Sequence, residues 1–197
     1  MALFQAGQTI EIREINPENL PEMLLEHTDN AKIPLLVAST TKSLGDSLDI
    51  MTWALNQKDP EYWLAANKDE MIALINQHDK TFVSALECIN HPEHFDETEQ
   101  QWAQDLILQT LEEIEKRLDE QRYLLGAHIS LADIALFPFI LQFKAINKYS
   151  FDGLPYSRVH QWLAEISFHR AFDSVMAEFQ LWTPGDPPVI LAPWGRS

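Results

Sequence analysis

Several residue types that mark particular protein classes are scarce in this sequence. Its 197 residues include one cysteine, six glycines and only 14 basic residues against 30 acidic ones. The single cysteine, Cys88, excludes an intrachain disulfide and fits a reducing compartment such as the cytoplasm. The formal charge of -16 repels nucleic-acid backbones and anionic lipid, so we expect neither nucleic acid nor a membrane surface as a partner.

Long hydrophobic runs are also missing. The longest apolar run, Ile134 to Phe143, is far shorter than the roughly 20 residues that a membrane helix needs. The first residues have neither the basic nor the apolar region of a secretory signal. The hydrophobic content of 46% still allows a substantial core, either in one large domain or in two small ones. We therefore expect a globular, cytoplasmic protein.

The hydrophobic pattern changes character along the chain. Alternation over Thr9–Ile15 predicts a half-buried strand, and Leu35–Ala38 predicts a buried strand that a turn joins to a short strand near Ser43. Asp46 or Ser47 caps a helix that continues through Leu55. From Pro60 onward the pattern indicates helices and connectors. We predict a first domain over residues 1–56, a linker over 57–66, a helical domain over 67–181 and a Pro-rich surface tail over 182–197.

Apolar residues at helical spacing mark four segments of the second domain. The predicted buried positions are Met71, Ile75, His78, Phe82 and Ile89 in the first segment, Trp102, Leu106, Leu111, Ile114 and Leu118 in the second, Val159, Trp162, Leu163 and Ile166 in the third, and Phe172, Val175, Met176 and Phe179 in the last. We expect the first two helices to pack antiparallel.

A further helix begins with a strong capping signal. Ser130 precedes an apolar stretch, and Asp133 stands three residues later, as in a capping box. The Asp133 carboxylate is expected to accept from the Ser130 N–H, and the Ser130 hydroxyl from the Asp133 N–H. Because the surroundings are apolar, this cap should be buried and valuable. Pro138 is expected to kink or locally unwind the helix, which runs to about residue 147.

Three motifs occur here in the order of a known family. Leu-Leu-Gly-x-x-x-Ser-Leu-Ala-Asp (124–133) resembles the start of the sixth helix in cytosolic glutathione S-transferases of the bacterial type. Upstream stand Ile-Pro-Leu-Leu (33–36) and Asp-Ser-Leu-Asp-Ile (46–50), which resemble two further family motifs. The resemblance implies an α+β fold: a truncated thioredoxin-like first domain followed by the all-α transferase domain.

The resemblance does not include the beginning of the family's sequence pattern. Met1–Ala6 resembles the tail of the family's first helix, with Gly7 as its C-terminal glycine, so the first strand and most of the first helix are expected to be absent. Removing that strand would leave its two neighbours with unpaired backbone groups. We therefore predict that Thr9–Ile15 is detached, displaced toward the next strand, or paired with another molecule, and that the sheet is not an ordinary four-stranded one.

The resemblance also implies which residues bind glutathione. Ile33–Pro34 matches the step at which a cis proline lets the preceding residue's backbone pair with the cysteinyl part of glutathione; an ordinary trans turn is the alternative. Asp46–Ser47 matches the acidic-Ser pair whose hydroxyl and helix amides hold the γ-glutamyl carboxylate; a simple helix cap is the alternative. No catalytic residue is assigned, because the family's Cys, Ser or Tyr lies in the missing segment.

Two functions remain open at this point. In one, the chain is a glutathione-conjugating or thiol-transferring enzyme that is weak or inactive as it stands, because its catalytic group lies upstream. In the other, it is a non-catalytic binding or assembly module with the same fold. The family implies glutathione as co-substrate, a hydrophobic electrophile as substrate and a symmetric homodimer.

Other reactive residues carry weaker signals. Cys88, His91 and His94 offer metal-ligand types at short spacing, but zinc sites favour four ligands in paired clusters and Pro92 interrupts the stretch, so we expect no metal. Cys88 is expected to pack in the core or at a helix end. His78 lies on an apolar helix face, where a hydrogen-bonded core histidine is favoured over a residue of a hydrophobic substrate pocket, so we assign it no catalysis.

Overall fold

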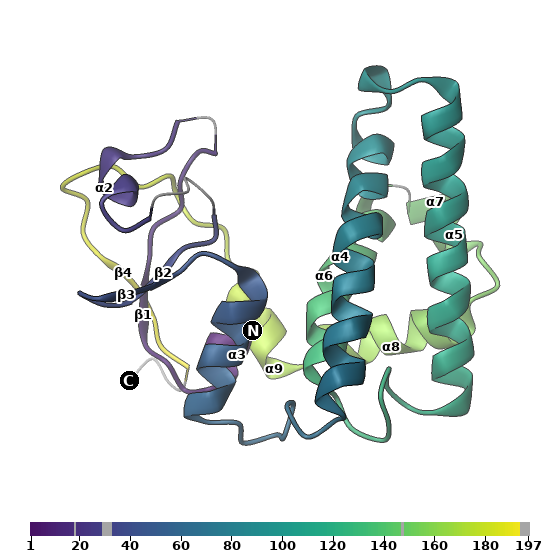
Figure 1. The fold of residues 1–197 in the computed structure, drawn as a ribbon, viewed down its shortest axis with the longest axis horizontal. Coiled ribbons are helices and arrows are strands. Elements are labelled where there is room, and N and C mark those ends of the chain that lie inside the picture. The colour runs from purple at the N-terminus through teal and green to yellow at the C-terminus, as the bar shows by residue number, and fades with distance from the viewer. Residues whose placement is uncertain (18, 29–32, 147, 194–197) are drawn as a thin grey trace. The chain divides into compact units, whose positions relative to one another are not determined.

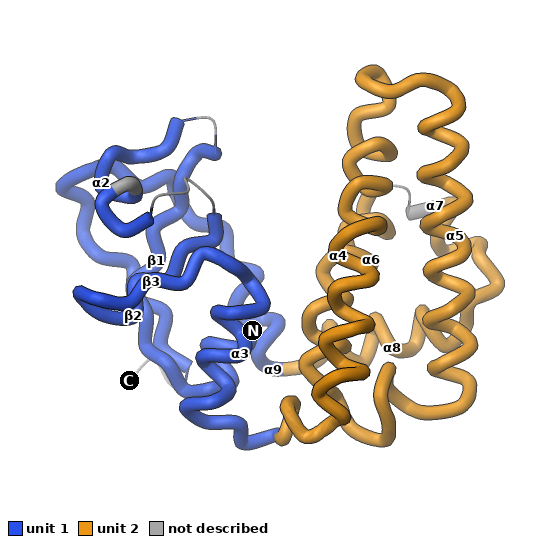
Figure 2. Tube along the Cα trace, viewed as in Figure 1, with its two compact units in different colours: residues 1–61, 170–197 blue, residues 62–169 orange. Residues whose placement is uncertain are grey.

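The computed structural model describes residues 1–17, 19–28, 33–146 and 148–193, and these form two compact units. Residues 1–61 and 170–197 make the first unit, and residues 62–169 make the second (Figure 2). The sequence-based boundaries ended the helical domain at residue 181. In the structure the end of the chain returns to the first unit, because its last helix packs on the first helix and its last strand pairs with the first strand.

The first unit combines short helices with two small sheets (Figure 1). Its elements are α1 (Ala2–Gln5), β1 (Ile10–Ile12), α2 (Glu22–Leu25), β2 (Leu36–Ser39), β3 (Lys42–Leu44), α3 (Ser47–Gln57), α9 (Arg170–Val175) and β4 (Val189–Leu191). Gly7 follows α1 with a φ of 74°, the left-handed conformation that glycine adopts without a Cβ penalty. The expected short helix that ends before Gly7 is therefore confirmed.

The strand β1 pairs with the end of the chain rather than with β2 or β3. It runs antiparallel to β4, with Ile10 opposite Leu191 and Ile12 opposite Val189. Next to this ladder, Glu14 and Leu181 form a separate parallel bridge, in which the Trp182 N–H donates to the Glu14 carbonyl at 2.7 Å. Among the described residues, then, the sheet is not an ordinary four-stranded one, as predicted. Pairing with the Pro-rich tail was not among the three outcomes that we expected for this strand.

The second sheet is the predicted hairpin. The strands β2 and β3 are antiparallel, with Leu36 opposite Leu44 and Val37 opposite Ser43. The helix α3 follows directly, and its N-cap is Asp46, whose Oδ1 accepts from the N–H groups of Leu48 at 2.8 Å and Asp49 at 3.2 Å. The hairpin and the following helix thus form one continuous local unit.

The second unit is helical. It contains α4 (Lys68–Asn90), a 3₁₀ turn η1 (Pro92–His94), α5 (Glu97–Glu120), α6 (Leu131–Ile146), α7 (Lys148–Asp152) and α8 (Ser157–Ser167). The helices α4 and α5 are antiparallel neighbours joined through η1, as predicted (Figure 1). The helix α6 continues through Pro138, so the expected local unwinding is not observed. None of the helices in the described ranges is long and apolar enough to cross a membrane.

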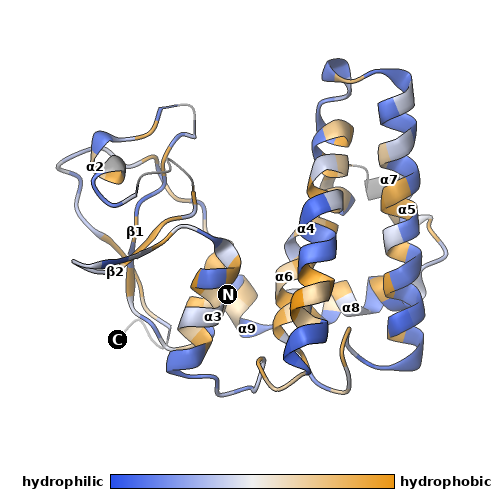
Figure 3. Ribbon diagram, viewed as in Figure 1, coloured by the Kyte–Doolittle hydropathy of each residue, from blue (hydrophilic) through white to orange (hydrophobic). Residues whose placement is uncertain are grey.

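The core of the second unit forms around α6. Figure 3 shows this helix as mostly hydrophobic, whereas α5 is hydrophobic on one side only. The predicted buried face of α8 is confirmed at all four positions. The predicted face of α5 was wrong at its start, because Trp102 is 48% exposed and the small Ala103 is buried instead. Counting back from Leu118 at intervals of three and four residues gives the observed buried stripe, which comprises Ile114, Leu111, Ile107 and Ala103.

The cap of α6 is buried, as predicted. The Asp133 side chain is fully buried, and its Oδ2 accepts from the Ser130 N–H at 2.8 Å and from the Ser130 hydroxyl at 2.6 Å. Its Oδ1 accepts from the Leu124 N–H and from Trp162 Nε1, each at 2.9 Å. Asp133 therefore joins the start of α6 to the preceding turn and to α8. Burial raises the pKa of Asp133, and these donors oppose the rise.

Candidate functional site

The hairpin brings the two candidate binding pairs to one end of a single sheet. Continuing the register of Leu36 opposite Leu44 by two residues places Pro34 opposite Asp46. The side chains agree with this placement, since a Cβ on Gly45 would lie 3.9 Å from Leu35 Cδ1. Segments that are about twelve residues apart in the sequence therefore meet where β2 begins and β3 ends.

One of these pairs sits at the start of α3. Asp46 is the N-cap and uses Oδ1 to satisfy two helix amides, so the capping role considered in the sequence is present in the structure. Ser47 is the first helical residue and is exposed. Within the described ranges nothing donates to or accepts from the Ser47 hydroxyl. This hydroxyl and the positively polarised end of an 11-residue helix can therefore both face an anion.

The other pair lies just before β2. The Ile33–Pro34 peptide bond is cis. Ile33 is 41% exposed, and Pro34 is exposed as well. Large aliphatic side chains are usually buried, so this exposed pair gives the end of the hairpin an apolar surface next to the anion-favouring helix start. An elongated ligand with a carboxylate at one end and a less polar part at the other matches this arrangement.

Two residue types that could activate a thiol are absent from this region. The sequence of residues 1–61 contains neither cysteine nor tyrosine. The single cysteine lies in the second unit, on α4, where it is only 2% exposed. Burial, together with the carboxylates of Glu99 and Asp96, raises the pKa of the Cys88 thiol, which keeps it protonated and unreactive. Core packing, as predicted, describes Cys88 better than nucleophilic catalysis.

His78 occupies the predicted position on the buried face of α4. It is 5% exposed, and its ring meets Phe82 edge-on at a centroid distance of 6.3 Å. Burial lowers the pKa of His78 to about 4, an effect that Arg117 reinforces and Glu113 opposes. The imidazole is therefore neutral at physiological pH, as a core histidine should be.

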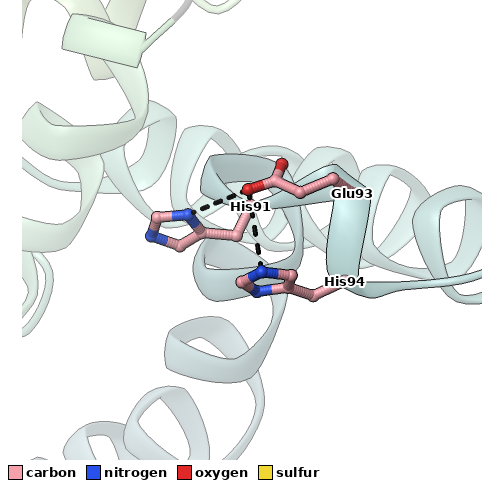
Figure 4. Close-up of side chains that lie close together, drawn as sticks. All are labelled: His91, Glu93 and His94. Carbon is pink, nitrogen blue, oxygen red and sulfur yellow. Dashed lines mark ion pairs between the residues drawn. The ribbon is translucent and has the colours of Figure 1, made fainter.

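The stretch that the sequence raised as a metal motif is rearranged in three dimensions. His91 and His94 do come together, with their rings stacked at 5.7 Å, but the third group beside them is Glu93 and not the buried Cys88 (Figure 4). Glu93 was not predicted as a ligand, because the motif in the sequence comprised only cysteine and histidine. A carboxylate between two histidines on a Pro-initiated turn is the signal that could have found it.

The surface of the second unit also has an open cavity of about 290 Å³ between α5 and α8. Both of its arginines are engaged by acids, Arg122 with Glu165 at 3.3 Å and Arg158 with Asp119 at 3.2 Å. The lining also includes Glu120, so the cavity has three acids and two arginines and carries a small net negative charge.

Comparison with known proteins supports the resemblance found in the sequence. Residues 1–62 match the family model for the glutathione S-transferase N-terminal domain, and residues 62–165 match the model for the glutathione S-transferase C-terminal domain. A search of curated protein sequences gives no match.

Solved structures share the fold. A ternary complex of BphK, a bacterial glutathione S-transferase, is 18% identical, with a TM-score of 0.76 and 88% of each chain covered. Glutathione S-transferase I bound to lactoylglutathione is 24% identical, with a TM-score of 0.70, and covers 87% of this chain and 88% of its own. A class Gtt2 enzyme of Vibrio parahaemolyticus is 17% identical, with a TM-score of 0.66, and covers 88% of this chain and 90% of its own.

Proposed function

We propose that this chain, which belongs to the glutathione S-transferase family, binds glutathione at the end of the β2–β3 hairpin. The observation that carries the proposal is the pairing of Leu36 with Leu44, which puts Ile33–Pro34, just before β2, and Asp46–Ser47, just after β3, at the same end of the hairpin. In this proposal the γ-glutamyl carboxylate lies at the start of α3, near the Ser47 hydroxyl, and the cysteinyl part lies along Ile33 and Pro34. Helix N-termini stabilise such anions through unpaired N–H groups and the helix dipole.

We propose further that these 197 residues, as they stand, bind glutathione weakly and turn over electrophiles negligibly. Conjugation requires a group that holds glutathione as its thiolate. Residues 1–61 contain no cysteine or tyrosine, their serines lie on the hairpin and at the start of α3 rather than at a first strand, and the Cys88 thiol is buried. The same observations favour the second candidate, a non-catalytic binding or assembly module. If conjugation does occur, we expect the electrophile to be hydrophobic, as the family implies.

Glutathione titration by calorimetry tests the binding proposal. Ser47→Ala should weaken binding about fivefold to tenfold, because a hydrogen bond to a charged group contributes about 1.5 kcal/mol or less at an exposed site. Ser174→Ala is the control, because its hydroxyl bonds to the Arg170 carbonyl within α9. Equal affinities of the two variants would contradict the assignment of Ser47. Rapid conjugation of standard electrophiles would contradict the proposed inactivity.

A homodimer is part of the proposal. The support is a set of exposed apolar side chains on α4 and α5, which comprises Val83 at 41%, Trp102 at 48% and Leu108 at 39%. Two-fold dimers are the commonest assemblies of soluble proteins. Sedimentation of Trp102→Glu should then show a larger monomer fraction than that of Phe168→Glu, which changes an exposed aromatic outside these helices. Identical sedimentation of the two variants would count against a dimer contact at Trp102. A cytoplasmic location is proposed as well, because Cys88 is a free thiol.

A further inference from the structure

Three side chains at the corner between α4 and α5 face one another (Figure 4). Glu93 Oε1 lies 3.5 Å from His91 Nδ1 and 3.9 Å from His94 Nε2. The three possible ligand atoms all lie within 4.8 Å of one another. Two imidazole nitrogens and one carboxylate oxygen thus surround the same small volume at the protein surface.

These separations are close to those within a metal centre. Bonds of about 2.0–2.2 Å to nitrogen and oxygen, arranged tetrahedrally, place neighbouring ligand atoms about 3.3 Å apart. The two observed nitrogen–oxygen distances, 3.5 and 3.9 Å, exceed this value by about 0.2 and 0.6 Å, which small side-chain rotations can close. We propose that His91, Glu93 and His94 bind one divalent first-row transition-metal ion of the Zn²⁺ type, with water completing the coordination. Two imidazoles favour such ions over Mg²⁺ and Ca²⁺, which prefer oxygen ligands alone.

The backbone that carries the ligands is held in place. Within η1, the His94 N–H donates to the His91 carbonyl at 3.0 Å, and the Phe95 N–H donates to the Pro92 carbonyl at 3.2 Å. Gln100 Nε2, from α5, also donates to the Pro92 carbonyl at 2.8 Å. The turn is therefore fixed to the first turns of α5, and metal binding needs adjustment of side chains rather than ordering of a loop.

A neighbouring amide can orient one of the ligands. His91 Nε2 lies 3.1 Å from Asn90 Nδ2. When Nδ1 binds a metal, the ring proton resides on Nε2 and requires an acceptor. A half-turn of the Asn90 amide places its Oδ1 there, which gives the outer-shell hydrogen bond that metal-bound histidines commonly make. Asn90 is therefore a positioning residue for this site.

Zinc titration of the full chain, freed of any polyhistidine tag, tests the proposal. Calorimetry with ZnSO₄ should show one equivalent bound, and saturating Zn²⁺ should raise the melting temperature by about 5 °C. His91→Gln, Glu93→Gln and His94→Gln should each weaken binding at least about tenfold, a loss comparable to that from removing an outer-shell partner. His128→Gln changes an exposed histidine elsewhere in the same unit and should leave the affinity unchanged.

A second metal reports the ligand types directly. The Co²⁺-loaded protein should show ligand-field absorption without a thiolate-to-cobalt charge-transfer band, and Cys88→Ala should leave the spectrum unchanged. Asn90→Ala should weaken Zn²⁺ binding while Co²⁺ at saturation keeps the same spectrum, as a positioning role requires. The proposal is overturned if the wild-type protein shows no saturable binding, if binding persists in the His91→Gln/His94→Gln double variant, or if a thiolate band is present.

Discussion

At the scale of the residue, one carboxylate contributes more contacts to the second unit than the sequence motif indicated. The motif predicted the link from Asp133 to the Ser130 N–H, and the structure confirms it. The additional donors, Leu124 N–H and Trp162 Nε1, come from a turn and from α8, so local sequence could not identify them. Asp133 is thus both a helix cap and a tertiary contact.

Replacing this carboxylate should therefore be severe. Asp133→Ala leaves four donor contacts without their acceptor in a fully buried position, which should lower the free energy of unfolding by about 3 kcal/mol or more. Asp173→Ala, at an exposed position of α9, should change it by less than about 0.5 kcal/mol. Urea denaturation followed by circular dichroism measures both. Equal midpoints would count against the buried cap.

His78 predicts a dependence of stability on pH. Its pKa falls from 6.5 in the unfolded chain to about 4 in the folded one, so between these values the unfolded state binds a proton that the folded state excludes. Stability should consequently decrease as the pH falls from 6.5 to 4 and then level off. The contribution of this residue is about 3–4 kcal/mol, because each pKa unit between 6.5 and about 4 is equivalent to about 1.4 kcal/mol.

The comparison of variants isolates that contribution from those of the carboxylates. His78→Leu cannot take up a proton, so the decrease in unfolding free energy between pH 6.5 and 4 should be smaller than in the wild type. His128→Gln, an exposed control, should follow the wild-type curve. Parallel curves for all three proteins would show that His78 is not buried in its neutral form.

At the scale of the element, regular helices were predictable and long-range strand pairing was not. The helix α8 has a regular spacing of apolar residues, and all four predicted positions are buried. In α5 the large Trp102 led to a wrong prediction of the buried side of the helix. Trp102 is exposed, and the small neighbouring residue Ala103 is buried instead. The strand β4 is three residues long in a Pro-rich segment, and its partner β1 lies at the other end of the sequence. No local pattern encodes that pairing.

The pairing of β1 with the tail has a specific side-chain support. The guanidinium of Arg13 lies 4.6 Å from the centre of the Trp182 ring, next to the backbone bond from Trp182 to Glu14. Trp182→Ala should therefore increase hydrogen exchange at the amides of Ile10–Ile12 by about tenfold, the equivalent of about 1.4 kcal/mol. Trp102→Ala removes an exposed tryptophan from α5 as the matched control. Unchanged protection in Trp182→Ala would refute this role of the tail.

At the scale of the whole molecule, the candidate binding site and the main hydrophobic core lie in different units. The first unit carries the hairpin and the start of α3, which are the candidate glutathione site, and the second carries the helical core around α6. The sequence motifs predicted both parts because they are local: a capped helix, an X-Pro step before a strand, and an acidic-Ser pair. That the two candidate pairs, Ile33–Pro34 and Asp46–Ser47, share one end of a hairpin became visible only from the register of β2 and β3.

Glutathione binding at the hairpin end is the proposal on which the assigned function depends. Titration of glutathione into the ¹⁵N-labelled chain, followed by amide-resolved NMR, tests it most directly. We predict that the largest shift changes occur at Ile33, Leu35 and Leu36 and at Asp46–Leu48, with α5 and α8 unaffected. Changes centred in the second unit, or no saturable change at the hairpin end, would contradict the claim.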